Sequence, residues 1–420
     1  MDELLGKKDQ RFPSSKLSIQ PRILMPTSTL PRWSGDSTPR FVLDLAAQVR
    51  ATGVDVRVLA PAFPGAASAE QLDEVDIERF SYALPAGLQT LCYDGGMLPN
   101  LRAHPLRWGL VPGFMAAALL AVRRAIRRWQ PDMVHAHWVL PMGLIAVLAA
   151  PRQVPVVVTV HGSDVLDLQG GALERLKTFV LSRASLVTCN GSITRAALAR
   201  LGVPEAKIRQ IPMGAAAPAA DAAHGLELPA ERCKLLFAGR LFSGKGLDDL
   251  LAALALLDET DRPLLLVAGT GPEEARFQAG ARELGIGDQV RFLGGLEHRR
   301  LLALMGAVDA VVVPTRNTEW VEAQGLVVAE AMLAGTPVIA TTGGGAEDHI
   351  RDGVNGLLVP PADPQALAAA IDRVRRNPTR ATAMAEAGRR YAADHLSWSA
   401  CAQAFAEVYG QVLPNAQGNT

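Results

Sequence analysis

Residues 322–341 read EAQGLVVAEAMLAGTPVIAT, a stretch that places two carboxylates, a glycine and a strand in close succession. Gly325 breaks the preceding loop, and the apolar run 326–333 predicts a short helix that a Gly-Thr-Pro sequence ends before a buried strand. Glu322 then lies just ahead of the helix N-terminus. Glu330 lies near the second turn, behind backbone N–H groups that have no partner within the helix. We interpret this stretch as a place where a diphosphate or a hydroxyl-rich ring binds.

Two glutamates eight positions apart are, taken alone, more often ordinary surface acids. Here the residues between them are almost wholly apolar, which predicts a buried helix, and a buried carboxylate without a partner is costly. A sugar nucleotide offers hydroxyl pairs that carboxylates accept, and a diphosphate that binds N–H groups and cations. The pattern therefore favours a sugar-nucleotide site.

Length and composition indicate a two-domain globular protein. The chain has 420 residues, of which 49% are hydrophobic and 20% charged. Lys plus Arg and Asp plus Glu are both 42, so no overall charge attracts nucleic acid. The four cysteines are scattered without metal-like pairs, which predicts reduced thiols in a cytoplasm. Neither a signal peptide nor a membrane anchor is expected, because the uncharged apolar runs are short.

Strands and helices alternate on both sides of an alanine- and proline-rich linker. The predicted strands are 22–26, 54–60, 75–80, 132–137, 156–160, 185–189 and 208–212, then 234–238, 264–268, 290–293, 310–313, 338–341 and 355–359. Asn190 is predicted to cap a helix at 193–201, and the last helices are predicted at 364–374 and 378–413. The predicted parts are a tail (1–20), a first domain (21–214), the linker (215–231), a second domain (232–395) and a C-terminal segment (396–420).

Polar residues follow the predicted strands of the second domain. Gly239 and Arg240 come directly after 234–238, and Lys245 opens the next helix. An Arg and a Lys in a loop are usually exposed to solvent and have no special role. At the end of a parallel strand they suit a diphosphate, since the planar guanidinium of Arg can bind two phosphate oxygens and the ammonium of Lys adds a compact positive charge. Gly271 and Thr315 follow two further strands, at positions suited to the base and phosphates.

In the first domain, the strand 156–160 runs into His161, and Asp164 follows three residues later. Such a strand end is where open α/β sheets bind ligands, although a lone histidine is more often structural. Asp164 can hold a hydroxyl or cap the next segment. His135 and His137 share one face of a strand and could form a metal pair, but no third ligand is visible, so buried hydrogen-bonded histidines are favoured.

The helix predicted at 115–129 carries an apolar stripe and four arginines outside it: Arg123, Arg124, Arg127 and Arg128. A solvated basic face is the commoner interpretation. The alternative is a face that meets anionic phospholipid or a lipid-diphosphate acceptor.

Taken in order, these motifs resemble the retaining glycosyltransferases of GT-B architecture known as family 4, or glycosyl transferases group 1, of the bacterial polysaccharide and glycolipid type. The resemblance lies in the E-x7-E segment 322–330 and in VTVHGSDV (158–165), FAGRLFSGKG (237–246) and GGGAEDHIRDGVNGLLVPPAD (343–363). It implies two Rossmann-like α/β domains facing a cleft, the first for the acceptor and the second for the nucleotide sugar. A final helix is expected to cross back to the first domain.

The resemblance also implies roles for individual residues. Arg240 and Lys245 are expected to stabilise the departing diphosphate, while His161 lines the pocket beside the reacting sugar. Glu322 is expected to position that sugar and Glu330 to hold the ribose. The other expected donor contacts are Gly239, Gly325, Leu326, Val327, Gly271, Leu293 and Thr315, and Gly35, Asp36 and Asp164 are expected on the acceptor side. Gln324 stands where the family often has an aromatic residue.

The predicted function is retaining transfer of a sugar from a nucleoside diphosphate, UDP or GDP, to a hydroxyl of a glycan or a lipid-linked acceptor. No cofactor is expected, and the Arg-Lys pair makes a metal unnecessary. The expected location is the cytoplasm or the inner face of the plasma membrane, in cell-envelope or exopolysaccharide synthesis. The alternatives are a GT-B nucleotide-sugar epimerase and a non-catalytic sugar-nucleotide-binding protein.

Overall fold

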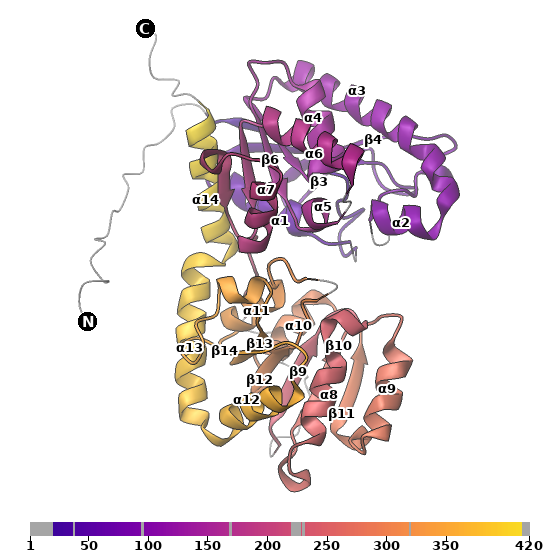
Figure 1. The fold of residues 1–420 in the computed structure, drawn as a ribbon. Helices are drawn as coiled ribbons and strands as arrows, with labels where there is room; N and C mark the ends of the chain where they lie inside the picture. Colours follow the sequence, from indigo (N-terminus) through magenta and orange to yellow (C-terminus); the bar gives the residue numbers. More distant parts are fainter. Residues whose placement is uncertain are drawn as a thin grey trace, which may run out of the picture.

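A computed structural model describes residues 20–36, 38–93, 96–167, 170–219, 228, 232–318 and 321–413. Within them the chain forms two α/β domains, one above the other in Figure 1, each a sheet with helices on both faces. The two Rossmann-like domains predicted from the sequence are therefore confirmed.

The first domain is built on an eight-stranded sheet with the order β3-β4-β2-β1-β5-β6-β7-β8. Its strands are β1 (Arg22–Pro26), β2 (Asp55–Pro61), β3 (Ala69–Leu72), β4 (Val75–Phe80), β5 (Met133–His137), β6 (Val156–Val160), β7 (Leu186–Cys189) and β8 (Ile208–Gln210). All neighbours are parallel except the edge pair β3 and β4. The sequence did not predict β3, because its short polar AEQL segment has no buried face.

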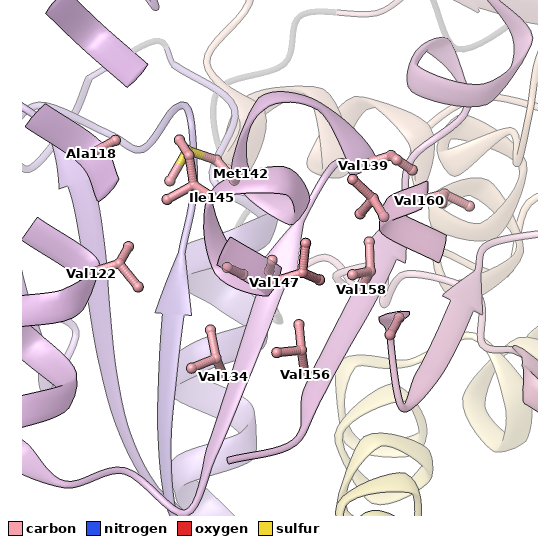
Figure 2. Packing of buried hydrophobic residues seen from close by; sticks show 14 of the residues in the cluster. Ala118, Val122, Val134, Val139, Met142, Ile145, Val147, Val156, Val158 and Val160 are labelled. Carbon is pink, nitrogen blue, oxygen red and sulfur yellow. The ribbon is translucent and has the colours of Figure 1, made fainter. Parts of the chain in front are cut away.

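Seven helices from the described part of residues 41–200 pack against this sheet: α1 (Phe41–Ala51), α2 (Met97–Ala103), α3 (Val111–Trp129), α4 (Leu144–Ala149), α5 (Ser163–Leu166), α6 (Gly171–Arg183) and α7 (Ser192–Arg200). Figure 2 shows one side of the core, where Ala118 and Val122 of α3 lie beside Ile145 of α4 and over the valines of β5 and β6. β5 and β6 are buried on both faces, as expected of the centre of a parallel sheet.

The second domain has a parallel six-stranded sheet with the order β11-β10-β9-β12-β13-β14. The strands are β9 (Lys234–Ala238), β10 (Leu264–Ala268), β11 (Val290–Gly294), β12 (Ala310–Val313), β13 (Val338–Thr341) and β14 (Leu357–Val359). Its helices are α8 (Leu247–Ala255), α9 (Glu274–Glu283), α10 (His298–Met305), α11 (Leu326–Leu333), α12 (Pro364–Arg376) and α13 (Pro378–His395), while α14 (Trp398–Val412) packs against the first domain. All six predicted strands are present, with bounds within two residues of the prediction.

Two predictions about helix ends are wrong. The helix predicted at 378–413 is broken at Ser397, whose side chain caps α14 by accepting a hydrogen bond from the Ala400 N–H at 3.2 Å. The cap of α7 is Gly191, whereas Asn190 accepts a hydrogen bond from the Thr194 hydroxyl at 2.9 Å. In Figure 1, α13 lies along the second domain and α14 along the first, so the expected crossing helix is present.

The chain passes between the domains twice, and the two crossings are bonded to each other. The Ala215 N–H donates to the Leu396 carbonyl at 2.8 Å, and Ala215 forms a parallel bridge with Ser397. Just before it, Gly214 lies directly against Trp398. Ala215, the first residue of the predicted linker, is therefore bonded to the second crossing. Linker positions 220–227 and 229–231 lie outside the described residues.

Gly214 on the first crossing lies close to Trp398 of α14, so a substitution at Gly214 tests how the two crossings pack together. A Cβ at position 214 would lie 2.5 Å from the indole ring of Trp398, so we expect Gly214→Ala to cost about 1–3 kcal/mol of stability. The matched control is Gly410→Ala on α14, where a Cβ meets nothing within 4 Å and alanine favours the helix. Thermal unfolding checks both variants. An unchanged melting temperature for Gly214→Ala would contradict the packing.

Candidate functional site

The carboxyl ends of the two sheets meet at the loop before α11. The Gln324 side chain is 4% exposed and holds both backbone groups of Met213: the Met213 N–H donates to Oε1 at 3.0 Å, and Nε2 donates to the Met213 carbonyl at 2.7 Å. Gln324 therefore joins the second domain to the last residues of the first. The Gln324 amide is bonded to the backbone of Met213, so this side chain does not take the part of the aromatic residue that the family often has at this position.

Ala323 packs into the first domain beside this clamp. A Cβ on Gly162 would lie 2.9 Å from the Ala323 Cβ, and one on Gly191 would lie 2.8 Å from the Ala323 carbonyl oxygen. The Asp348 carboxylate accepts a hydrogen bond from the Ser192 N–H at 2.7 Å across the same junction. The loop that carries Glu322 thus touches the strand ends that carry His161.

Lys245 and Glu322 form a salt bridge at this junction, with side chains that are 15% and 24% exposed. Glu322 is held through its backbone, because its carbonyl accepts from the Gly345 N–H at 2.7 Å. Lys245 is positioned by Gly246, whose φ is +71° and whose missing Cβ leaves room for the Pro314 carbonyl oxygen. The two predicted catalytic residues are therefore neighbours.

Arg240 differs from Lys245 in its surroundings. Its side chain is exposed, and the guanidinium lies 5.8 Å from the ring centroid of Phe242. Within the described part of the chain it has no ion-pair partner. The guanidinium is therefore available to an anionic ligand at the end of β9.

Glu330 is 9% exposed, and its Oε1 lies 2.7 Å from the Nε2 of His298 at the start of α10. This hydrogen bond raises the pKa of His298, and the Asp44 carboxylate on α1 of the other domain adds to the rise while Arg40 opposes it. The sequence predicted the carboxylate but not its partner. No motif marks His298, which the fold brings to Glu330 from 32 positions away.

His161 lies at the exit of β6, with its ring between Phe41 and Trp138 at centroid distances of 4.9 and 4.8 Å. Its Nε2 is 3.0 Å from Nδ1 of His137. Burial lowers the pKa of His161 to about 3, so the imidazole is neutral near pH 7.

Asp164 is buried, and its carboxylate bonds to backbone N–H groups. It accepts backbone hydrogen bonds from Val139 at 2.9 Å, His161 at 3.0 Å and Gly162 at 3.1 Å. Burial raises the pKa of this carboxyl, although those hydrogen bonds oppose the rise. Of the two uses expected for Asp164, the cap is not observed: Asp164 lies inside α5, whose N-cap is Gly162, and its carboxylate instead fixes the loop of His161.

Asp36 and Gly35 lie in a loop that closes on itself. The Asp36 carboxylate pairs with the Arg32 guanidinium at 2.7 Å and accepts from the Arg32 N–H at 2.8 Å, with 2% of its side chain exposed. Although burial acts in the opposite direction, these contacts lower the pKa of Asp36. Gly35 has a φ of +80° and is exposed. Both residues shape the loop, and neither lines the cavity described next.

A cavity of about 580 Å³ opens in the first domain next to these loops. Its lining is mainly apolar, and Asp164 and Arg240 also contribute to it. The apolar lining includes Phe41, Met97, Leu101, Trp108, Val111 and Leu140. Arg240 comes from the second domain, so this cavity and the end of β9 are adjacent.

The remaining predicted donor residues lie at strand exits and at the start of α11. Gly325 caps α11 with a φ of +75°, followed by the exposed Leu326 and the partly buried Val327. Gly239 ends β9, Gly271 packs against the backbone of Leu241, Leu293 is exposed on β11, and Thr315 is buried after β12. Among the described residues no three His, Cys, Asp or Glu side chains are placed to hold a metal.

Residues 38–216 match the family described as Glycosyltransferase Family 4, and residues 222–391 match Glycosyl transferases group 1. The D-inositol 3-phosphate glycosyltransferase of Xylanimonas cellulosilytica is 30% identical over 397 residues, covering 88% of this chain and 90% of that protein. The chain belongs to glycosyltransferase family 4. It is therefore an enzyme of the glycosyltransferase class, and the resemblance seen in the motifs is confirmed at that level.

Other relatives support the same assignment. A glycogen synthase of Mycobacterium tuberculosis is 35% identical over 295 residues, which cover 67% of this chain and 69% of that protein. The sucrose-phosphate synthase of Thermosynechococcus elongatus has a TM-score of 0.76 at 25% identity, covering 94% of this chain and 99% of that one. The Anabaena protein HepE, solved with UDP, has a TM-score of 0.71 at 20% identity and covers 93% of this chain and all of its own. The fold of this family 4 enzyme is GT-B.

The pairing of His298 with Glu330 predicts a pH-dependent stability. Because pairing raises the pKa of His298 in the folded state, the stabilisation is fully present below its ordinary value of 6.5 and disappears as the pH rises through the raised value. We expect His298→Gln to lower the melting temperature at pH 6 and to have little effect at pH 9. His104→Gln, an exposed control, should show no such trend. An equal effect at both pH values would contradict the pairing.

Proposed function

We propose that this enzyme transfers a sugar with retention from UDP or GDP to a hydroxyl of a glycan or a lipid-linked acceptor, in cell-envelope or exopolysaccharide synthesis. The observation that carries the proposal is the convergence of Arg240, the Lys245–Glu322 pair and the start of α11 beside the cavity of the other domain. Two cations and a helix N-terminus suit a diphosphate, and the adjoining cavity suits an acceptor.

In this proposal the diphosphate lies between Arg240, Lys245 and the N–H groups of Leu326 and Val327 at the start of α11. The diphosphate takes over the charge of Lys245, which frees the Glu322 carboxylate for hydroxyls of the sugar. Two cations can neutralise a departing diphosphate, so the proposed reaction requires no metal.

The ribose is assigned to Glu330. One oxygen of this carboxylate contacts His298, and the other can accept from a ribose hydroxyl. The exposed Leu293 at the end of β11 is assigned to the side of the base.

Retention follows from attack on the face from which the diphosphate leaves. The bond from the anomeric carbon to phosphate oxygen breaks, the bond to the acceptor oxygen forms, and the acceptor proton passes to the departing phosphate. His161 is too weak a base for this proton at neutral pH, because its pKa is about 3. Its role in the proposal is a hydrogen bond to the transferring sugar.

Support for a lipid-linked acceptor comes from the apolar cavity and the segment beside it. Trp108 in η2 (Pro105–Leu110) lines the cavity and is 57% exposed, while neighbouring Leu106 is 96% exposed and Leu120 of α3 is 52% exposed. Residues Pro105–Trp129 are long and apolar enough to cross a membrane, yet only 28% of their most apolar window is buried. We therefore propose that this segment lies on the inner face of the membrane, with the protein otherwise in the cytoplasm.

The arginines of α3 fit the same arrangement. Arg123, Arg124, Arg127 and Arg128 are all exposed, so their charges are presented to the surroundings. Basic side chains beside exposed apolar ones are typical of helices that lie on anionic lipid.

Removing the cation at the end of β9 tests the reaction. We expect Arg240→Ala to lower kcat for sugar transfer by roughly 10²–10³-fold, because an exposed charge that stabilises the leaving group is lost without loss of packing. Arg152→Ala, which removes an exposed arginine far from the site, is the control. The assay measures nucleotide release and labelled product with UDP- and GDP-sugars and a set of acceptors, and NMR of the product gives its anomeric configuration.

The outcomes separate the alternatives. An inverted product would contradict retention, and equal rates for both variants would contradict the role of Arg240. A changed sugar nucleotide without any acceptor would identify an epimerase. Binding of a sugar nucleotide with no turnover under any condition would identify a non-catalytic protein.

Vesicle flotation tests the membrane proposal. We expect binding to vesicles with anionic lipid that weakens with salt and falls by about thirtyfold or more in Arg124→Glu/Arg127→Glu, since each arginine contributes about 1 kcal/mol. Leu106→Ser/Trp108→Ser should also reduce binding. Leu284→Ser, which changes an exposed leucine of the second domain, is the control. Wild-type protein that stays at the bottom of the gradient would contradict membrane contact and leave the transferase reaction unaffected.

A further inference from the structure

A group of buried histidines lies directly beneath His161, and the proposed function assigns no role to it. His135 and His137 point from β5 into the interior, both 0% exposed, with ring centroids 4.6 Å apart. His135 uses both ring nitrogens: Nδ1 is 2.8 Å from the hydroxyl of Tyr409 on α14, and Nε2 is 2.6 Å from the hydroxyl of Thr159. His135 is thus a fixed part of the core.

His137 uses only one ring nitrogen. Its Nδ1 is 3.0 Å from Nε2 of His161, whereas its own Nε2 is buried and has no hydrogen-bond partner among the described residues. The two ring planes differ by 19° and the centroids are 5.2 Å apart, which fits two imidazoles joined edge to edge. This contact links the core to the candidate site.

Both rings are neutral, so each carries one ring proton. Burial lowers the pKa of His137 well below its ordinary value, and the charges that His135 and His161 would carry act in the same direction. Burial likewise lowers the pKa of His161 to about 3. With one proton on each ring, one histidine must donate to the other, and two arrangements are possible.

The unpartnered nitrogen of His137 decides between them. If His161 donated, the proton of His137 would sit on Nε2, as a buried N–H group without an acceptor, which costs the full desolvation of a donor. If His137 donates from Nδ1, its Nε2 keeps only an unused lone pair. The buried N–H of His137 is then bonded to His161, so the second arrangement is favoured.

We propose that His137 is a positioning residue that holds His161 in the Nδ1–H tautomer. The Nδ1–H of His161 then diverges from His137, while Phe41 and Trp138 fix the ring and Asp164 fixes its backbone. His161 presents a neutral N–H donor in a fixed direction at the domain junction. The identity of its acceptor as a sugar oxygen rests on the proposed function, whereas the tautomer does not.

Nitrogen NMR of the protein with 15N-labelled histidine tests the tautomer without any substrate. The signals of His161 are assigned by their loss in His161→Asn. In the wild type we expect a protonated Nδ1 and an unprotonated Nε2 for His161, and in His137→Leu a mixture of tautomers. A protonated Nε2 in the wild type, or the same tautomer in His137→Leu, would overturn the proposal.

Kinetics test the consequence for the reaction. We expect His137→Leu to lower kcat by roughly tenfold to a hundredfold, the range seen when a group that orients a functional histidine is removed, with little change in donor KM. His137→Asn, whose amide can place an N–H near the position of Nδ1, should recover most of kcat. A merely structural role would lower the melting temperature and kcat of both variants alike, which would contradict positioning. Absence of turnover in the wild type would defeat the proposed function, and the NMR result would still decide the tautomer.

Discussion

The side chain of Gln324 bonds to both backbone groups of Met213, and the relation between the two domains depends on this contact. The amide is buried, so replacing it would leave a peptide N–H and a carbonyl without partners, at about 1–3 kcal/mol each. Gln324 stands two residues after Glu322 and one before the cap of α11. The same residue that joins the domains therefore fixes the start of the helix and the carboxylate that pairs with Lys245.

In the structure the charged residues of the candidate donor site are already held by protein contacts. Lys245 contacts Glu322, Glu330 contacts His298, and Arg240 lies over Phe242. Under the proposed function, the diphosphate takes the place of Glu322 on Lys245 and contacts Arg240, while Glu330 keeps His298 on one oxygen and binds the ribose with the other. The charges therefore do not have to be assembled when the ligand binds, which is the condition for effective electrostatic stabilisation.

The sequence was sufficient to predict the parallel strands of the two sheets and their exits, because such strands are buried on both faces and read as short apolar runs. It therefore placed Arg240, Lys245, Glu322 and His161 at the end of the sheets where they are found. Contacts over long separations could not be predicted: His298 reaches Glu330 across 32 positions, and Gln324 reaches Met213 across 111. Asp36 and Asp164 were candidate ligand contacts, yet their oxygens bond to protein N–H groups: Asp36 to its own loop, and Asp164 to its own loop and to Val139.

The central claim is that the second domain of this family 4 enzyme binds a nucleoside diphosphate through Lys245 and its neighbours. Isothermal titration of UDP and GDP into the wild type and into Lys245→Ala, each shown to be folded, tests it most directly. We expect saturable binding of one nucleoside diphosphate at one site per chain, weakened by roughly tenfold or more in Lys245→Ala, since a charge-assisted hydrogen bond contributes about 1.5–3 kcal/mol. Equal affinity in both proteins, or no binding of either nucleotide to the folded wild type, would contradict it.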